Sequence, residues 1–104
     1  TLSDVADHID HVRRRIGIAH VGIGSDFDGI TSTPVGLEDV SRFPDLLVEL
    51  LRRGYSDDEV AAVAGLNALR VLREAERVAW RLRRERPPSY LRLEAADLTG
   101  ARPR

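Results

Sequence analysis

The sequence contains no cysteine and no methionine, and only 5% of its residues are aromatic. Without cysteine, neither a disulfide nor a thiolate metal site can form. No apolar run approaches the roughly 20 residues that a membrane-spanning helix needs. The first residues lack the basic start and the apolar core of a signal peptide. The lack of cysteine leaves the compartment undecided, whereas the lack of a targeting or membrane segment favours a cytoplasmic location.

The residues that are present fit a globular domain or a piece of one. The chain has 104 residues, of which 42% are hydrophobic and 32% are charged, a balance typical of folded proteins. The 16 Lys and Arg residues nearly balance the 17 Asp and Glu residues. Net charge therefore gives no case for binding nucleic acid or an anionic membrane. The missing initiator methionine predicts that the chain is the end of a longer one.

A helix followed by an apolar strand is predicted at the beginning of the chain. Ser3 is expected to cap the helix, and Gly17 to close it. Its apolar residues recur at helical spacing, namely Val5, Ile9, Val12 and Ile16. The apolar stretch Ile18–Gly24 then predicts a strand. Because one strand cannot satisfy its own backbone groups, its neighbours must come from outside this chain.

A long loop and further helices are predicted after the strand. Residues 29–40 are rich in turn formers, and a connection of this length at the end of a strand is often functional. A second helix should begin near Pro44, since proline suits the first helical turn, and should end at Gly54. Ser56 and Glu59 form a capping-box pattern that opens a third helix.

The last predicted helix leads into a tail. Gly65 should interrupt the third helix, and Asn67 is expected to cap a fourth that runs to about Arg86. The pattern then loses its period after two prolines. We therefore expect two parts, residues 1–86 and an extended C-terminal tail of residues 87–104.

Two carboxylates follow the predicted strand directly. Within the run His20–Gly29, an alternating apolar part ends in glycines and is followed by Asp26 and Asp28. In α/β folds, catalytic groups lie at the carboxyl ends of strands, where loops are held by a rigid scaffold. An acidic pair at this place indicates either an active site or an ordinary solvated loop, and the pattern alone leaves both interpretations open.

Several segments taken together resemble one family. The matching segments are Asp7–His11, Val21–Gly29, Gly36–Ser41 with Pro44, Leu50–Ser56, and Gly65–Asn67 with Leu69–Leu72. In this order and spacing they resemble the C-terminal part of the membrane dipeptidases, also called renal-type dipeptidases, the zinc-dependent peptidase family M19. Leu66 departs from the glycine that is more usual at its position.

The resemblance implies an α/β fold, a (β/α)₈ barrel of the metal-dependent hydrolase type. Residues 1–86 would then be its C-terminal segment, with Ile18–Gly24 as the eighth strand, a long loop after it, and helices that close the barrel. A full barrel takes about 250 residues, so the upstream part of the barrel is required. A homodimer is left open.

The resemblance also implies a function, hydrolysis of dipeptides by a zinc metallopeptidase. The family's centre holds two zinc ions, and no position of this chain corresponds to their ligands, so the chain alone is expected to be inactive. Asp26 corresponds to the acidic residue that ends the eighth strand, where it contacts the substrate's amino group and carries a proton from the attacking water to the leaving amine. Asp28 is the weaker candidate for substrate binding and is expected to shape the turn.

Other interpretations of the charged residues are less favoured. His8, Asp10 and His11 share a helix face, but this helix would lie outside the barrel, so we expect structural hydrogen bonds rather than a metal site. His20 lies at the start of the strand and is also expected to be structural. A calcium loop after Asp26 is rejected, because apolar residues occupy the positions that need oxygen ligands.

The alternative function is a helical interaction or nucleic-acid-binding module. Ser56–Leu72 has the outline of a helix-turn-helix, and arginines such as Arg70 and Arg73 would then contact phosphates. Glutamates are interleaved with these arginines, which favours surface ion pairs along a helix. This alternative also leaves the glycine-rich strand and the two aspartates unexplained.

Overall fold

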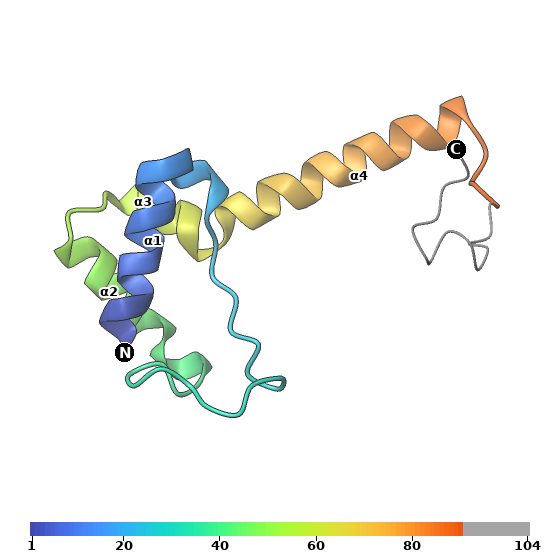
Figure 1. The fold of residues 1–104 in the computed structure, drawn as a ribbon. Coiled ribbons are helices and arrows are strands. Elements are labelled where there is room, and N and C mark those ends of the chain that lie inside the picture. Colours follow the sequence, from blue (N-terminus) through green and yellow to red (C-terminus); the bar gives the residue numbers. More distant parts are fainter. Residues whose placement is uncertain (91–104) are drawn as a thin grey trace, which may run out of the picture. The chain divides into compact units, whose positions relative to one another are not determined.

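The structure is a computed structural model that describes residues 1–90, and its regular elements are all helical (Figure 1). Residues 1–74 form one compact unit, and a second unit begins at Ala75. The elements in chain order are α1 (Leu2–Ile16), the 3₁₀ turn η1 (Ile18–His20), the 3₁₀ turn η2 (Val40–Arg42), α2 (Phe43–Arg52), α3 (Asp57–Ala61), the π-helical turn η3 (Ala62–Leu66) and α4 (Asn67–Glu85).

Helix α1 begins two residues earlier than the sequence predicts. The N-cap is Thr1 and not Ser3, since the Thr1 hydroxyl accepts a hydrogen bond from the Asp4 N–H at 3.3 Å and the Asp4 side chain completes a capping box. The two candidates have the same chemistry, and only Thr1 has an acidic residue three positions further on. Gly17 closes the helix with φ 91°, as predicted.

The predicted second and third helices are confirmed. Pro44 lies in the first turn of α2, and Leu46 and Leu50 on its apolar face are buried. The Ser56 hydroxyl accepts from the Glu59 N–H at 3.2 Å, which is the predicted capping box of α3. Local sequence signals therefore fix where both helices start.

The chain bends at Gly65 and then continues into α4. Gly65 has non-helical backbone angles inside η3, which confirms the predicted interruption. Helix α4 ends at Glu85, one residue before the predicted end. Of the predicted tail, residues 91–104 lie outside the described residues, and its boundary at residue 87 stays a prediction.

The core of the first unit lies between α1, α2 and the α3–η3 segment. Helix α1 contacts α2, α2 contacts α3, and η1 contacts η3 (Figure 1). The buried apolar residues are Ala6, Ile9, Leu37, Leu46, Leu50, Tyr55 and Val63. These side chains come from α1, α2, η3 and the loops at Leu37 and Tyr55, so hydrophobic burial joins α1 to the later segments.

The predicted strand Ile18–Gly24 is not formed, and residues 1–90 contain no strand. Ile18–His20 forms a 3₁₀ turn instead. The backbone becomes extended at Val21, which has φ −122° and ψ 142°. A strand needs the N–H and C=O groups of a neighbouring strand. The described residues offer no such neighbour, so the segment is extended but unpaired.

One arginine links the end of α2 to α1. Arg53 makes five hydrogen bonds: Nε to Glu49 at 2.9 Å, Nη1 to Asp7 at 2.6 Å and Asp10 at 2.7 Å, and Nη2 to the carbonyl and hydroxyl oxygens of Ser3 at 3.1 and 2.9 Å. Its carboxylate partners raise the pKa of the Arg53 guanidinium. The acidic face of α1 is therefore held against the α2 terminus by charge-assisted hydrogen bonds.

Tyr55 extends this polar contact into the core. Its hydroxyl donates to Asp10 Oδ1 at 2.7 Å, and the Arg13 guanidinium lies 4.2 Å from its ring centroid. Burial, followed by the hydrogen bond to Asp10, raises the pKa of Tyr55 to about 12. Arg13 also binds Glu59, so α1 is tied to α3. These contacts confirm that Asp10 makes structural hydrogen bonds.

Acidification should weaken this contact through Asp10. Burial raises the pKa of its carboxyl, but the hydrogen bonds from Tyr55 and Arg53 outweigh it, and the pKa lies below its ordinary value of 3.8. A carboxyl with a lowered pKa in the folded state stabilises above its unfolded pKa, and that stability is lost as pH falls through the folded pKa. The unfolding free energy of the wild type should therefore fall between neutral pH and about pH 4 or below, and that of Asp10→Asn should fall by less. Urea titrations at neutral and acidic pH measure both changes.

A matched control is Asp45→Asn, because Asp45 is exposed and meets Arg42 only at 3.4 Å. This variant should follow the wild-type pH dependence. An Asp10→Asn protein with the full wild-type loss on acidification would contradict a stabilising role for this carboxylate.

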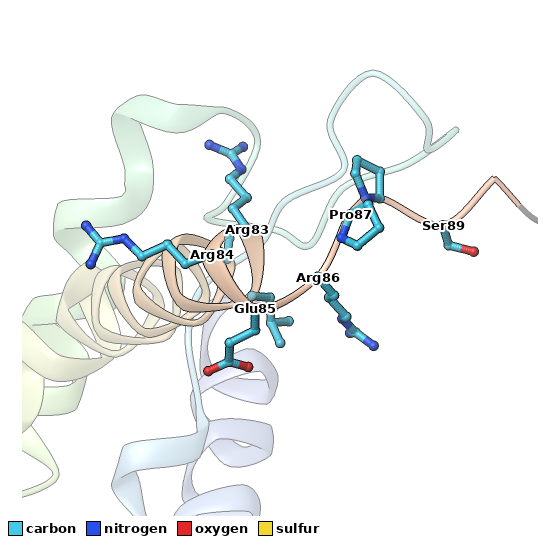
Figure 2. A pocket seen from close by; sticks show the side chains of 9 residues that line it. Arg83, Arg84, Glu85, Arg86, Pro87 and Ser89 are labelled. Atoms are coloured by element: carbon cyan, nitrogen blue, oxygen red, sulfur yellow. The ribbon is translucent and has the colours of Figure 1, made fainter.

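The second unit, described to residue 90, contains the C-terminal part of α4 and the residues after it. A shallow hollow lies beside its last turn, lined by Ala79, Leu82 and residues 83–89. Figure 2 shows that the side chains of Arg83, Arg84 and Arg86 point in different directions, so their charges do not converge. None of the helices in residues 1–90 has the length and apolar character needed to cross a bilayer.

Candidate functional site

The extended segment before the two aspartates has the side-chain alternation of a strand. Half-buried and exposed residues alternate along it: Val21, Ile23, Ser25 and Phe27 are half-buried, and Gly22, Gly24, Asp26 and Asp28 are exposed. Period-two alternation places successive side chains on opposite faces. The alternation places Gly22 and Gly24 on the outer face, and both carboxylates, at the turn that follows, are exposed as well.

The start of this segment is held by the first turns of α4. The Asn67 side chain donates to the Ile18 carbonyl at 2.7 Å and to the Val21 carbonyl at 2.9 Å, and the Arg70 guanidinium donates to the Ala19 carbonyl at 2.6 Å. Asn67 is buried, with 9% of its surface exposed. The predicted N-cap role of Asn67 is wrong, because Asn67 has helical backbone angles, φ −64° and ψ −49°. Its side-chain amide instead donates to the carbonyls of Ile18 and Val21.

Sequence reasoning missed this anchoring role because it is not local. Asn67 lies 49 and 46 positions from the residues whose carbonyls it binds. The one available signal was its position directly after the bend at Gly65, where an asparagine also fits a capping role. A pattern read along one helix cannot separate the two roles.

The segment ends in a tight turn at Asp26. Asp26 has φ 53°, and within residues 1–90 it is the only non-glycine residue with positive φ. The Gly29 N–H donates to the Asp26 carbonyl at 2.8 Å, which closes the turn. Asp tolerates the left-handed region better than most residues, and such conformations are concentrated at functional sites.

An aromatic contact fixes the turn to the start of α2. The ring of Phe27 stacks on that of Phe43, with centroids 6.0 Å apart and 24° between the planes. Phe27 points toward the protein while its neighbours Asp26 and Asp28 are exposed. The turn is therefore anchored on its inner side, and its carboxylates are accessible on the outer side.

The loop after the turn is fixed only in its second half. The Leu2 N–H donates to the Val35 carbonyl at 2.8 Å, and the Gly36 N–H donates to the Glu38 carboxylate at 2.6 Å, which lowers the pKa of Glu38. Residues 30–33 are exposed. The part nearest Asp26 is thus the part available to a ligand.

The described residues do not fit a metal centre of their own. No group of three or more His, Asp or Glu side chains in residues 1–90 converges as metal ligands do. His8, His11 and His20 are exposed, and Asp10 is engaged by Arg53 and Tyr55. No zinc-binding role is therefore assigned to any of residues 1–90.

Two of the arginines of α4 are engaged within the chain. Arg70 is engaged with a backbone carbonyl, and Arg81 lies 3.7 Å from the Glu85 carboxylate. A recognition helix would present such side chains outward to phosphates. No observation favours the alternative function.

An extended segment that ends in a carboxylate-bearing turn, with helices packed on one side, is typical of a strand end in an α/β enzyme. The family model for membrane dipeptidase, peptidase family M19, matches residues 1–86. The chain therefore belongs to the membrane dipeptidase family. Membership implies a (β/α)₈-barrel fold, and the helical elements of residues 1–90 are compatible with a part of such a barrel.

The curated relatives that the chain resembles are named dipeptidases, as the family match leads one to expect. The chain is 54% identical over 83 residues to dipeptidase verJ of Clonostachys rogersoniana (80% of this chain, 21% of the relative). It is 58% identical over 79 residues to dipeptidase aclJ of Aspergillus oryzae (76% and 19%) and 53% identical over 81 residues to dipeptidase ataJ of Aspergillus terreus (78% and 20%). The chain spans about a fifth of the length of these relatives.

Proposed function

We propose that this chain is the C-terminal part of a barrel enzyme that hydrolyses dipeptides, and that Asp26 is its catalytic carboxylate. The observation that carries the proposal is the family match over residues 1–86, together with the accessible carboxylate at the end of an extended segment. Asp28 contributes to substrate binding in a weaker role. The boundary between residues 1–86 and the tail 87–104 is part of the same proposal.

Unsatisfied surfaces support the need for the upstream barrel. The extended backbone after Val21 pairs with no strand in residues 1–90. Large apolar side chains are also exposed in the first unit, at Leu66 (57%) and Leu72 (57%) among others. Neighbouring strands would satisfy the backbone groups, and adjacent helices would cover the apolar side chains. The segment after Val21 is thus suited to be the barrel's eighth strand.

The chemistry that we assign to this chain is proton transfer and amine recognition. The family resemblance implies two zinc ions, held by ligands outside this chain, which would activate water and polarise the scissile carbonyl. Asp26 would bind the free amino group of the dipeptide and pass a proton to the leaving amine. Its exposure leaves the carboxylate free for both contacts.

The direct test is hydrolysis by the full-length protein. We expect dipeptides with a free amino terminus to be cleaved, and their N-acetylated forms to be cleaved far more slowly, because acetylation removes the charge that Asp26 would bind. Release of free amino acids would be followed by chromatography. Equal cleavage of both forms would contradict amine recognition, and no cleavage across a broad dipeptide panel would contradict the function.

A cytoplasmic location and a homodimer also stay predictions.

The 104-residue chain by itself should neither hold catalytic zinc nor turn over dipeptides. A lone carboxylate does not retain zinc against water, and the described residues supply no convergent ligand set. Bound zinc would be measured after dialysis, and dipeptide hydrolysis with zinc added. Tight stoichiometric zinc with turnover would contradict the assignment of all metal ligands to other parts of the barrel.

A further inference from the structure

We infer that Gly29 is a positioning residue for the Asp26 carboxylate, because the space that a side chain at position 29 would fill is the space that this carboxylate occupies. The inference rests on the proposed function of Asp26. It assigns a role in the reaction to a residue that carries no side chain and that the sequence marks only as a turn former.

The geometry at Gly29 is specific. A Cβ atom built on Gly29 would lie 2.6 Å from Asp26 Oδ1, 3.1 Å from its Cγ and 3.2 Å from its Oδ2. Non-bonded carbon and oxygen atoms do not approach to 2.6 Å. The three nearest atoms all belong to the one carboxylate group, so a side chain at position 29 would compete first with that group.

The backbone does not explain the glycine. The glycines with positive φ in residues 1–90 are Gly17, Gly36 and Gly54, and Gly29 is not among them. The φ of Gly29 therefore does not by itself demand a glycine. The turn itself also allows a side chain, since its hydrogen bond uses only the Gly29 N–H and the Asp26 carbonyl. The requirement is for space alone.

The carboxylate is the group that would move. Asp26 is held in the left-handed region and Phe27 is stacked on Phe43, so the backbone of the turn is anchored. The carboxylate lies at the end of a rotatable side chain and is exposed. A methyl group at position 29 would therefore rotate the carboxylate away and leave the turn in place, changing the position of the reacting group more than the stability of the fold.

The test is Gly29→Ala in the full-length protein. A displacement of about 1 Å can cost roughly 100-fold in rate, so we expect kcat to fall about 10- to 100-fold. The melting temperature should stay close to that of the wild type. A variant that keeps wild-type kcat would overturn the inference, as would one whose loss of activity follows a loss of folded protein in circular dichroism.

The matched control is the same substitution without the carboxylate. In an Asp26→Ala background no group remains for the new methyl to displace, so Asp26→Ala/Gly29→Ala should be no slower than Asp26→Ala alone, measured at high enzyme concentration. If Gly29→Ala reduces the rate by the same factor in both backgrounds, its role is structural and the inference fails. If Asp26→Ala alone keeps wild-type turnover, the proposed role of Asp26 fails first.

Discussion

Asp26→Asn in the full-length protein should reduce kcat by about 10²- to 10⁴-fold, the range that a positioned general acid–base group contributes. Asparagine has the same shape but can neither accept the proton nor carry the charge that binds an amino group. The substitution leaves the turn hydrogen bond from the Gly29 N–H intact, because that bond uses the Asp26 carbonyl. Initial rates on a dipeptide panel, with metal content measured in parallel, check this expectation.

The matched control for Asp26 is Asp28→Asn, two residues further along the same turn and also exposed. It should change KM modestly and leave kcat nearly intact. A severe loss of kcat in Asp28→Asn with near-normal turnover in Asp26→Asn would move the catalytic role to Asp28. Normal turnover in both variants would remove this turn from the active site. Because both changes remove one negative charge, the comparison separates position from net charge.

Asn67→Leu should destabilise the folded protein by about 2 kcal/mol, because two part-buried carbonyls would lose their donor and an unsatisfied carbonyl costs roughly 1–3 kcal/mol. Leucine has the same branched arrangement of side-chain heavy atoms and is somewhat larger, so the site is not emptied, but the carbonyls of Ile18 and Val21 lose their donor. Urea unfolding of the full-length protein measures the loss. Hydrogen exchange should also become faster in residues 18–25, because the base of the extended segment is released.

The control for Asn67 is Arg70→Met, which removes one hydrogen bond, to the Ala19 carbonyl, from an exposed side chain. Its effect on the unfolding free energy should be clearly smaller. If Asn67→Leu unfolds at the wild-type urea concentration and exchanges no faster in residues 18–25, the two hydrogen bonds do not anchor this segment.

The features that could be predicted from the sequence depend on neighbouring residues. The capping box at Ser56, the proline in the first turn of α2 and the glycine that closes α1 each act within one helical turn. Their partners lie within a few positions along the chain, so a pattern identifies them. The error at the start of α1 is of the same local kind, since two equivalent hydroxyl residues compete for one cap.

The features that could not be predicted depend on distant residues or on another part of the barrel. The contacts of Arg53 with Asp7 and Asp10 span 46 and 43 positions, and no periodicity encodes them. The strand at Ile18–Gly24 was predicted from its composition, but pairing is a property of two segments, and the described residues supply only one. From Val21 onward, half-buried and exposed residues alternate as in a strand. The order of apolar residues and glycines therefore specifies the alternation but not the pairing.

The candidate site divides in the same way. Asp26 could be located from its place after an apolar, glycine-rich stretch and from the family resemblance. Three features could be found only from the structure: the left-handed backbone of Asp26, the stacking of Phe27 on Phe43, and the close approach of the Asp26 carboxylate to Gly29. The sequence could therefore suggest which carboxylate acts, while the structure adds what holds it.

Arg53 illustrates how little freedom of substitution a single position can have. A guanidinium carries five N–H donors, and all five are used in the hydrogen bonds to Ser3, Asp7, Asp10 and Glu49. Lysine has the same charge but only three donors, which radiate from one nitrogen and cannot reproduce a planar fork. Among natural variants of this chain, a change at position 53 should therefore be accompanied by changes at its partners on α1.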